Sequence, residues 1–338
     1  FHNRKSLLEP LLEKVKDQSF NRIVILATGS SSNAAECAKY FISDLLEVEI
    51  TIKMPFVVSN YDQNIDNNAL YFAISQSGQS YSTIEAVKEI QKRSNLPVFT
   101  FTSDLNSEIA NVSTCPIDIG CGKETVGFVT MGFSATVLIL LLTGLELALQ
   151  KTKIDKSTYD ELNEKILDVI HYTDTVIERS NQWFDLNKEQ LANGKKFSVI
   201  GYGSGFGVAK EAETKLTETI RRPVIGYELE EYMHGPYLAL DDESYIIFIE
   251  HNGLLEERAG KLKNYLADYT SNIFTICLNS AEPKEETLQL QFDVDEHLAA
   301  LLTVIPIQIL AYKLAGYIGI DLNVKVFTDF DEKLKSKV

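Results

Sequence analysis

Short apolar runs alternate with segments of helical periodicity along the first third of the chain. The run RIVILA at 22–27 has the β-branched composition of a buried strand. The same kind of pattern predicts strands at 48–53, 69–74 and 97–102, and helices at 5–16, 33–46 and 82–93. Alternation of strand and helix is typical of a parallel sheet that is covered by helices on its faces.

The second half of the chain repeats this alternation. We expect strands at 196–202, 223–227, 244–250 and 272–277. Between the halves, residues 155–192 are charged and helix-prone without a strand signal, and we interpret them as a helical bridge.

Matching glycines indicate that the two halves are copies of one unit. The stretch ATGSSSNAAECAKYF begins at Ala27, and GYGSGFGVAKEAETKL begins at Gly201. Gly203 follows Gly29 by 174 residues (203 − 29), and Gly253 follows Gly78 by 175 (253 − 78). Repetition at a nearly constant offset predicts an α/β protein with two tandem nucleotide-binding-like domains, each a three-layer sandwich with a central parallel sheet.

We therefore expect four segments. They are an N-terminal domain at 1–154, the helical bridge at 155–192, a C-terminal domain at 193–322 and a tail at 323–338.

Net charge changes the picture of possible partners. The 338 residues carry a net charge of −16, which argues against nucleic acid and against anionic membranes as partners. An anionic ligand must then be held by local dipoles and hydroxyl groups. The most apolar stretches, 137–149 and 298–320, contain charged or polar residues such as Glu146 and Lys313, and we interpret both as buried helices.

The cysteines form neither a CxxC pair nor a zinc set. We expect reduced thiols, no metal site and a cytoplasmic protein. The four are Cys37, Cys115, Cys121 and Cys277.

A serine-rich loop follows the third predicted strand. Residues 75–80 read SQSGQS and lead into a helix. Small residues let backbone N–H groups approach an anion, the hydroxyls and the Gln76 amide donate hydrogen bonds, and the helix N-terminus adds a positive dipole end. Ser31, after the first strand, is expected at the same sheet edge. The pattern predicts a phosphate site, although a solvated turn with a helix cap has the same composition.

The second copy has different chemistry at the matching place. It reads Glu250-His251-Asn252-Gly253, without a serine pair and with an added carboxylate. Because a carboxylate repels phosphate, we expect only the first half to bind phosphate.

The strings ATGSSSN and SQSGQS, together with a later His-Gly-Pro at 234–236, resemble the sugar-isomerase (SIS) domain family. From about residue 20 onward the chain looks like a tandem pair of such domains. It is similar to the isomerase half of glucosamine-6-phosphate synthase, to fructosamine-6-phosphate deglycases and to glucosamine-6-phosphate deaminases. The resemblance implies that the serine loop holds a 6-phosphate. The implied phosphate and substrate contacts are Gly29, Ser30, Ser31, Ser75, Gln76, Ser77, Ser80, Glu124, Glu211 and Lys215.

The resemblance also implies an acid–base machinery. Glu211, Lys215 and Glu218 share one helix face by their spacing, which in isolation is typical of a solvated ion-pair ladder. By resemblance Glu218 is the carboxylate that moves a proton between C1 and C2. His234, in a loop that glycine and proline restrict, is implied to open the sugar ring in a neighbouring subunit.

The tail ends in LKSKV, and related proteins close a lysine-bearing tail over the site. Lys335 and Lys337 are both candidates for this lysine, and a frayed charged terminus is the alternative.

Two departures from the family pattern concern activity. Only about 20 residues precede the first strand and no N-terminal cysteine is present, so we do not expect a complete glutamine-dependent synthase. The segment ETVGFVTMGF at 124–133 differs from the EIGVAST-type loop of the family, and bulky Phe128 and Met131 are expected to reshape the sugar pocket.

The sequence thus favours an enzyme acting on an amino-linked sugar 6-phosphate by deglycation or deamination, without a metal or organic cofactor. A simple aldose–ketose isomerase would use the same residues. A non-catalytic sugar-phosphate sensor and a detached isomerase part of a glutamine–fructose-6-phosphate aminotransferase are the alternatives. We expect a homodimer or larger even oligomer with shared active sites.

Overall fold

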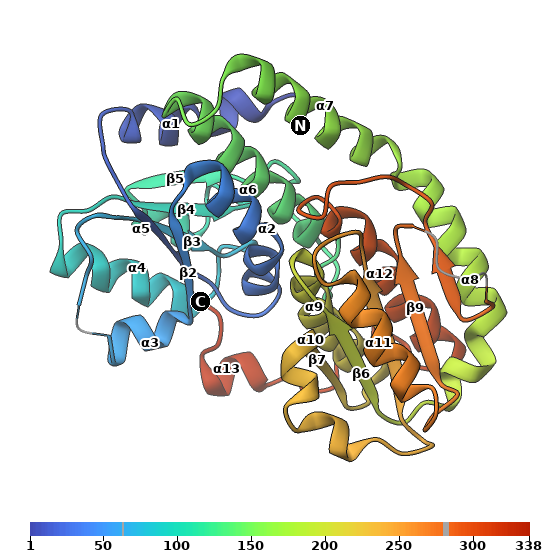
Figure 1. The fold of residues 1–338 in the computed structure, drawn as a ribbon. Coiled ribbons are helices and arrows are strands. Elements are labelled where there is room, and N and C mark those ends of the chain that lie inside the picture. Colours follow the sequence, from blue (N-terminus) through green and yellow to red (C-terminus); the bar gives the residue numbers. More distant parts are fainter. Residues whose placement is uncertain (63, 280–283) are drawn as a thin grey trace. The chain divides into compact units, whose positions relative to one another are not determined.

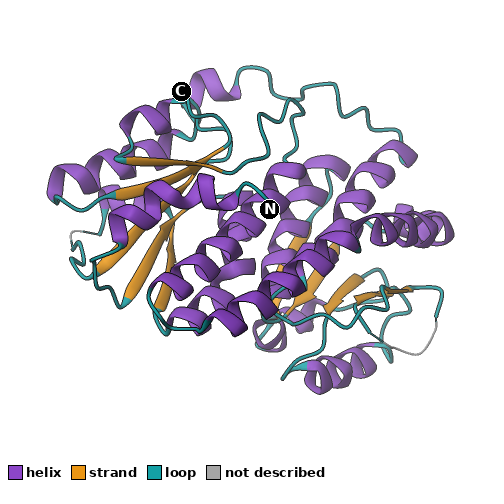
Figure 2. Cartoon of the chain, turned by 90° about the horizontal axis from the view of Figure 1, so that it is seen from above, coloured by secondary structure: helices purple, strands orange, loops and turns teal. Residues whose placement is uncertain are grey.

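The computed structural model describes residues 1–62, 64–279 and 284–338, which form two units. The first unit comprises Phe1–Leu162 and Lys325–Val338, and the second comprises Asn163–Val324. Each unit contains a five-stranded sheet with helices on its faces (Figures 1 and 2). All strand pairs in both sheets are parallel, which confirms the predicted α/β class.

The first sheet has the strand order β2-β1-β3-β4-β5. Its strands are β1 (Arg22–Leu26), β2 (Glu49–Lys53), β3 (Ala69–Ile74), β4 (Val98–Thr102) and β5 (Cys115–Asp118). The central β3 is buried along its whole length, as expected for a parallel strand that is covered on both faces. The edge strand β2 is only partly buried.

The second sheet has the order β10-β9-β8-β6-β7. Its strands are β6 (Phe197–Gly201), β7 (Val224–Glu228), β8 (Tyr245–Glu250), β9 (Ile273–Cys277) and β10 (Thr287–Gln289). When each strand of the second sheet is matched with its counterpart in the first, β6 with β1, β7 with β2 and so on, the two strand orders are identical. The predicted tandem repeat is therefore present in the topology.

Two of the helices correspond to the long apolar stretches that the sequence predicts as buried helices. Those of the first unit are α1 (Arg4–Val15), α2 (Ser30–Leu46), α3 (Pro55–Asn60), α4 (Tyr81–Arg93), α5 (Glu108–Val112), α6 (Met131–Gln150) and, in the tail, α13 (Phe330–Leu334). Helix α7 (Lys156–His171) begins in the first unit and ends in the second. The second unit adds α8 (Thr173–Asn193), α9 (Ser204–Ile220), α10 (Leu229–Met233), α11 (Glu256–Leu266), α12 (Ala300–Tyr317) and a 3₁₀ turn at Pro236–Ala239.

The repeat extends to backbone conformation. Helices α2 and α9 both have 17 residues. Each is preceded by a glycine with positive φ, 57° at Gly29 and 53° at Gly203. Each ends at a left-handed residue, Glu47 or Arg221, with φ of 55°. Because glycine turns the chain abruptly, α2 starts at Ser30, three residues before the predicted start.

Helices α6 and α12 are long and apolar enough to cross a membrane, yet 78% and 67% of their most apolar windows are buried. Helix α6 packs on α2, and α12 packs on α8 and α9, as core helices do. Glu146 of α6 is paired inside: its Oε1 accepts from Arg4 Nε at 3.0 Å and from the Tyr159 hydroxyl at 2.7 Å. A buried carboxylate needs such partners to remain charged.

The predicted bridge at 155–192 forms α7 and α8, of which α8 packs on α12. The tail from Lys325 groups with the first unit rather than with the unit that precedes it in sequence. The predicted functional division at residues 154, 192 and 322 stays a prediction.

Candidate phosphate site and acid–base residues

The serine loop connects β3 to α4 in a tightly bonded conformation. Gly78 N donates to Ser75 O at 2.9 Å, and Ser80 N donates to Ser75 Oγ at 3.3 Å. Gly78 has a φ of 73°, and a Cβ built there would lie 2.1 Å from Ser107 Oγ. Only glycine fits this position, because the left-handed conformation and the close approach of Ser107 both exclude a side chain.

A cavity of about 330 Å³ lies over this loop. Its wall is formed by the segments that follow β1, β3, β4 and β5, together with the tail. In the sheet order, β1 and β3 are neighbours from which the chain proceeds to opposite sides. Ligands of open parallel sheets bind at such a switch point, outside the carboxyl ends of the strands.

Most residues that the resemblance assigns to phosphate and substrate line this cavity. These are Ser31, Ser75, Gln76, Ser77, Ser80 and Glu124, and the candidate tail lysine Lys337 lines it as well. Gly29 and Ser30 do not line it, but their neighbours Thr28 and Ser31 do. The segment 124–133 contributes Val126, Gly127 and Val129, whereas Phe128 and Met131 do not line the cavity. Gln79 of the serine loop also lines it, and the lining residues that sequence reasoning missed are Ser103, Asp104 and Lys123. Ser103 and Asp104 carried a detectable signal, because they directly follow predicted strand 97–102.

The Gln76 side chain is held against the start of α6. A Cβ on Gly132 would lie 2.7 Å from the Gln76 amide, so glycine makes room for it. Gln76 Nε2 donates to Ser103 Oγ at 3.3 Å, and Ser103 N donates to Gln76 O at 2.9 Å. The loops after β3 and β4 therefore act as one bonded wall.

Glu124 accepts hydrogen bonds at the N-terminus of α6. Its Oε1 accepts from Thr130 N at 2.9 Å and Met131 N at 3.2 Å, and its Oε2 accepts from Gly132 N at 3.0 Å. A carboxylate at a helix N-terminus satisfies N–H groups that have no partner within the helix. Glu124 thus closes the segment 124–132 into a loop that forms part of the cavity wall.

The C-terminal tail runs antiparallel to the serine loop. Tyr81 N donates to Ser336 O at 3.3 Å, and Val338 N donates to Gln79 O at 3.2 Å. Ser80 and Lys337 form an isolated bridge. Lys337 lines the cavity, whereas Lys335 is exposed at the left-handed end of α13 and does not line it.

The residues that the resemblance assigns to proton transfer lie in the second unit, on α9. Glu211 is fully buried and Lys215 nearly so. Lys215 Nζ donates to Glu218 Oε2 at 2.6 Å, while the Glu218 side chain keeps 42% of its surface exposed. A lysine that is buried along its stem and paired at its tip differs from one in a solvated ladder, because burial removes the water that would otherwise surround the charge.

His234 lies at the end of α10, beside the turn that Gly235 and Pro236 form. Gly235 has a φ of 135°, and the 3₁₀ turn starts at Pro236. The His234 side chain is 75% exposed, with Nε2 4.0 Å from Glu230 Oε2. Arg258 pairs with Glu230, and this pairing lowers the pKa of the Glu230 carboxyl. The imidazole is thus presented to solvent by a short, fixed turn.

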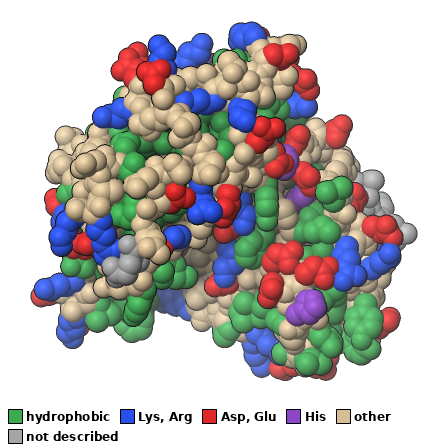
Figure 3. Space-filling model, turned by 60° about the vertical axis from the view of Figure 1, so that its left-hand side comes forward, with side chains coloured by type: hydrophobic (Ala, Val, Ile, Leu, Met, Phe, Trp, Pro, Cys, Tyr) green, Lys and Arg blue, Asp and Glu red, His purple; other side chains and the backbone are tan. Residues whose placement is uncertain are grey.

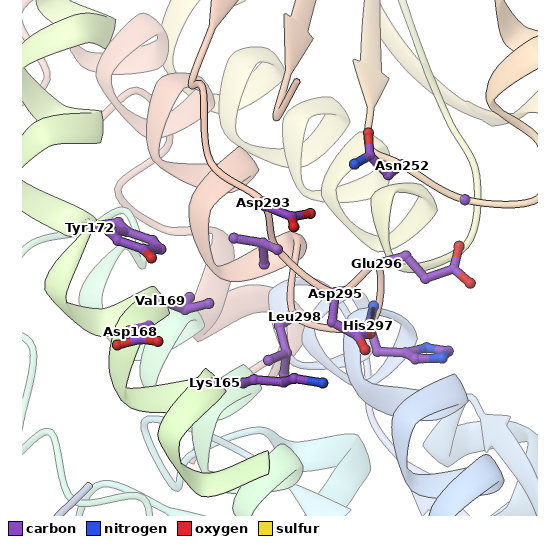
Figure 4. A pocket seen from close by; sticks show the side chains of 12 residues that line it. Lys165, Asp168, Val169, Tyr172, Asn252, Asp293, Asp295, Glu296, His297 and Leu298 are labelled. Atoms are coloured by element: carbon purple, nitrogen blue, oxygen red, sulfur yellow. Dashed lines mark hydrogen bonds between the residues drawn. The ribbon is translucent and has the colours of Figure 1, made fainter. Parts of the chain in front are cut away.

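A larger cavity, of about 520 Å³, lies in the second unit (Figure 4). Lys165, Asp168, Val169 and Tyr172 reach it from α7, residues 293–298 line it from the segment before α12, and Asn252 and Gly253 line it from the loop after β8. Its carboxylates are Asp168, Asp293, Asp295 and Glu296. Four carboxylates repel an anion, so the smaller cavity at the serine loop is the better phosphate site despite its size.

On the face drawn in Figure 3, acidic and basic side chains are interspersed. Among the residues that the structure describes, no group of three or more His, Cys, Asp or Glu side chains is arranged to hold a metal ion.

The fold and this site define a protein of two doubly wound α/β units with a candidate anion site at a strand switch point. Residues 18–145 and 190–316 match the family model of the SIS domain. These segments make up most of the chain, which therefore belongs to the SIS domain family. The resemblance that the ATGSSSN, SQSGQS and His-Gly-Pro motifs indicated is confirmed.

Two solved structures and one curated relative place the chain within this family. A Clostridium difficile 630 protein, proposed to be a phosphosugar isomerase, has a TM-score of 0.90 at 31% identity, with 98% of this chain and 93% of that chain covered. A Salmonella typhimurium LT2 protein, proposed to bind sugar, has a TM-score of 0.82 at 25% identity, with 92% and 93% covered. An isomerizing glutamine–fructose-6-phosphate aminotransferase of Bacteroides thetaiotaomicron is 26% identical over 321 residues, which are 92% of this chain and 51% of that protein. The chain spans about half the length of the curated relatives it matches.

Proposed function

We propose that this protein is a phosphosugar enzyme that acts on an amino-linked sugar 6-phosphate, as a fructosamine-6-phosphate deglycase or a glucosamine-6-phosphate deaminase/isomerase does. The observation that carries the proposal is the serine-loop cavity, which hydroxyl, amide and lysine side chains line and which the C-terminal tail borders. The similarity to a proposed phosphosugar isomerase and to an isomerizing aminotransferase supports the same substrate class.

The proposed reaction starts with ring opening. His234 of a neighbouring subunit transfers the proton that converts the ring form into the open carbonyl form. The exposed position of His234 supports a role outside its own chain. In a ketoamine, Glu218 then removes a proton from C1 and returns it to C2, which converts the ketoamine into an imine at C1. Water hydrolyses this imine, and an aldose 6-phosphate and a free amine leave. The substrate carbonyl accepts the electron pair, so the proposal requires neither a metal nor an organic cofactor.

Two features support the assignment of Glu218 and Lys337. The Lys215 ammonium holds Glu218 at 2.6 Å while leaving the carboxylate accessible to a ligand. The tail places Lys337 rather than Lys335 at the cavity, where its amine is positioned to meet an open-chain carbonyl. Glu211 and Lys215 are proposed to orient Glu218.

Three alternatives use the same cavity. An aldose–ketose isomerase would stop before hydrolysis. The similarity to the Bacteroides thetaiotaomicron aminotransferase favours an isomerase part of such a synthase, and the Salmonella typhimurium protein favours a non-catalytic sugar-phosphate sensor. A sensor requires the serine loop but not Glu218 and His234.

The deciding experiment incubates the protein with fructosamine 6-phosphates, glucosamine 6-phosphate and fructose 6-phosphate in deuterated solvent. The proposal predicts release of amine or ammonia and exchange of a carbon-bound proton with solvent, at C1 of a ketoamine or ketose and at C2 of glucosamine 6-phosphate. Interconversion of sugar phosphates without amine release would identify an isomerase. Tight binding without any exchange would identify a sensor.

We further propose a cytoplasmic homodimer, or a larger even oligomer, with active sites shared between subunits. A mixture of His234→Ala and Glu218→Gln chains should then regain activity, because some hybrid sites combine an intact His234 with an intact Glu218. Light scattering that shows a fully active monomer would contradict the shared site.

A further inference from the structure

The charge of the serine-loop cavity comes from very few side chains. The loop itself offers neutral donors, namely hydroxyls, the Gln76 amide and backbone N–H groups. Among the described residues that line the cavity, the acidic ones are Asp104 and Glu124, and the basic ones are Lys123 and Lys337. Three backbone N–H groups already engage the Glu124 carboxylate. A phosphate monoester, which carries a charge of about −1.5 to −2 at neutral pH, thus depends on the two lysines for opposite charge.

The two lysines differ in what holds them. Lys337 belongs to the tail that pairs with the serine loop, and its Nζ lies 3.9 Å from Asp331 Oδ2. Lys123 is exposed, and no hydrogen bond or ion pair joins its ammonium to residues 1–62, 64–279 or 284–338. The adjacent Glu124 fixes the backbone beside it through the bonds to the start of α6. The backbone beside Lys123 is therefore held in place at the cavity, while its ammonium has no partner among the residues that the structure describes.

We propose that Lys123 determines the charge specificity of this site, by favouring a doubly charged phosphate monoester over a singly charged anion of the same shape. This inference rests on the proposed sugar-phosphate function. The ammonium is a compact cation on a flexible stem, so it can approach the ligand without disturbing the serine loop. Its effect is needed because the protein as a whole is strongly acidic, with a net charge of −16.

The test compares fructose 6-phosphate with fructose 6-sulfate, which has a similar shape but a single negative charge. Titration calorimetry of the full chain at pH 8 gives both dissociation constants. We expect the wild type to prefer the phosphate ester by about tenfold or more, since the attraction between an ammonium and an anion grows with the charge of the anion. Lys123→Met should reduce this preference severalfold, mainly by weakening phosphate binding, and Lys123→Arg should retain it.

Lys92→Met is the matched control. Lys92 lies on α4 in the same unit, is largely exposed and does not line the cavity. Lys92→Met removes the same charge from the unit as Lys123→Met does, but away from the cavity. It should therefore leave the phosphate-to-sulfate preference unchanged. An equal loss of preference in both variants would show that the overall charge of the unit, and not the position of Lys123, sets the preference. That result would overturn the proposal.

Ser77→Ala separates this inference from the proposed function. If Ser77→Ala weakens binding of both esters and Lys123→Met leaves their ratio unchanged, the serine-loop site stands and the role of Lys123 is wrong. If Ser77→Ala changes neither dissociation constant, the phosphate site itself is wrong.

Discussion

The loops after β3 and β8 occupy matching places in the two units, yet they leave different surroundings for the glycines that start the matching helices. Gly29 and Gly203 start matching helices with nearly the same φ. A Cβ built on Gly29 would meet nothing within 4 Å, whereas one on Gly203 would lie 3.3 Å from the His251 ring. The imidazole of His251 fills space in the second unit that stays open in the first.

The His251 ring lies between two backbone carbonyl oxygens. Its ring nitrogens lie 2.9 Å from Tyr202 O and 3.0 Å from Asn252 O, and its side chain is completely buried. The neighbouring Glu250 pairs with Lys263 at 2.8 Å. The comparison teaches that helix starts and glycines maintain the frame of the repeat, while a few side chains decide which groups the sheet edge presents and how much space lies beside the helix start.

The largest effect is expected for Glu218→Gln, which tests whether the second unit supplies the proton-transfer residue while the first binds phosphate. Glu218→Gln keeps the shape but cannot accept a C–H proton, so turnover should fall by about 10²–10⁴ with little change in sugar-phosphate affinity. Steady-state kinetics and exchange of the C1 or C2 substrate proton with solvent measure it. Glu257→Gln, at an exposed position of α11 beside Lys261, is the control. Turnover within tenfold of wild type in Glu218→Gln would refute the assignment.

The next largest difference between the two units is expected from alanine substitutions at the matching loop glycines, Gly78 and Gly253. Gly78→Ala forces a side chain into a left-handed conformation and against Ser107, and we expect a loss of about 2 kcal/mol in unfolding free energy. It should also weaken fructose 6-phosphate binding at least tenfold.

In Gly253→Ala the new Cβ meets the end of the flexible Glu296 side chain, without a positive φ at this residue. The cost should stay below about 1 kcal/mol, and sugar-phosphate affinity should not change. Urea unfolding and calorimetry measure both pairs of values. Equal effects of the two substitutions on binding would contradict the difference between the loops.

Removing the ring of His251 probes what the side chain beside Gly203 contributes to the second unit. His251→Ala leaves the Tyr202 and Asn252 carbonyls without this partner and should cost about 1–3 kcal/mol in unfolding free energy. His171→Ala, at an exposed position of α7, should cost less than about 0.5 kcal/mol. No phosphate binding should appear in His251→Ala, because Glu250 remains. If calorimetry did detect phosphate binding by His251→Ala, the His251 ring and not the Glu250 carboxylate would be what excludes the anion in the wild type.

The smallest effect concerns acid stability of the first unit. Lys53 pairs with Asp62 and thereby lowers the pKa of the Asp62 carboxyl. The stabilisation is present above the unfolded pKa of about 3.9 and is lost as the pH falls through the lower folded value. Between pH 6 and pH 3, Asp62→Asn should lose less stability than the wild type, by about 0.2–1 kcal/mol, as measured by urea unfolding. An unchanged pH profile would show that the pair adds nothing.

Local sequence patterns determined much of the fold. The four strands expected in each half are present, because continuous apolar runs such as that of β3 are typical of buried parallel strands. Strands β5 and β10 were missed. Both are short edge strands, and β5 contains Pro116, so their pairing depends on a neighbouring strand instead of their own pattern.

The sequence by itself also determined the serine loop, since glycine and serine at a strand end restrict the backbone locally. Only the tertiary structure decided what surrounds that loop. Lys123 joins the wall of the cavity because Glu124 binds the start of α6, and Lys337 does so because the tail pairs with Ser80. The tail contact joins segments far apart in the chain, and the Glu124 contacts close an irregular loop, so no periodic pattern in the sequence encodes either of them.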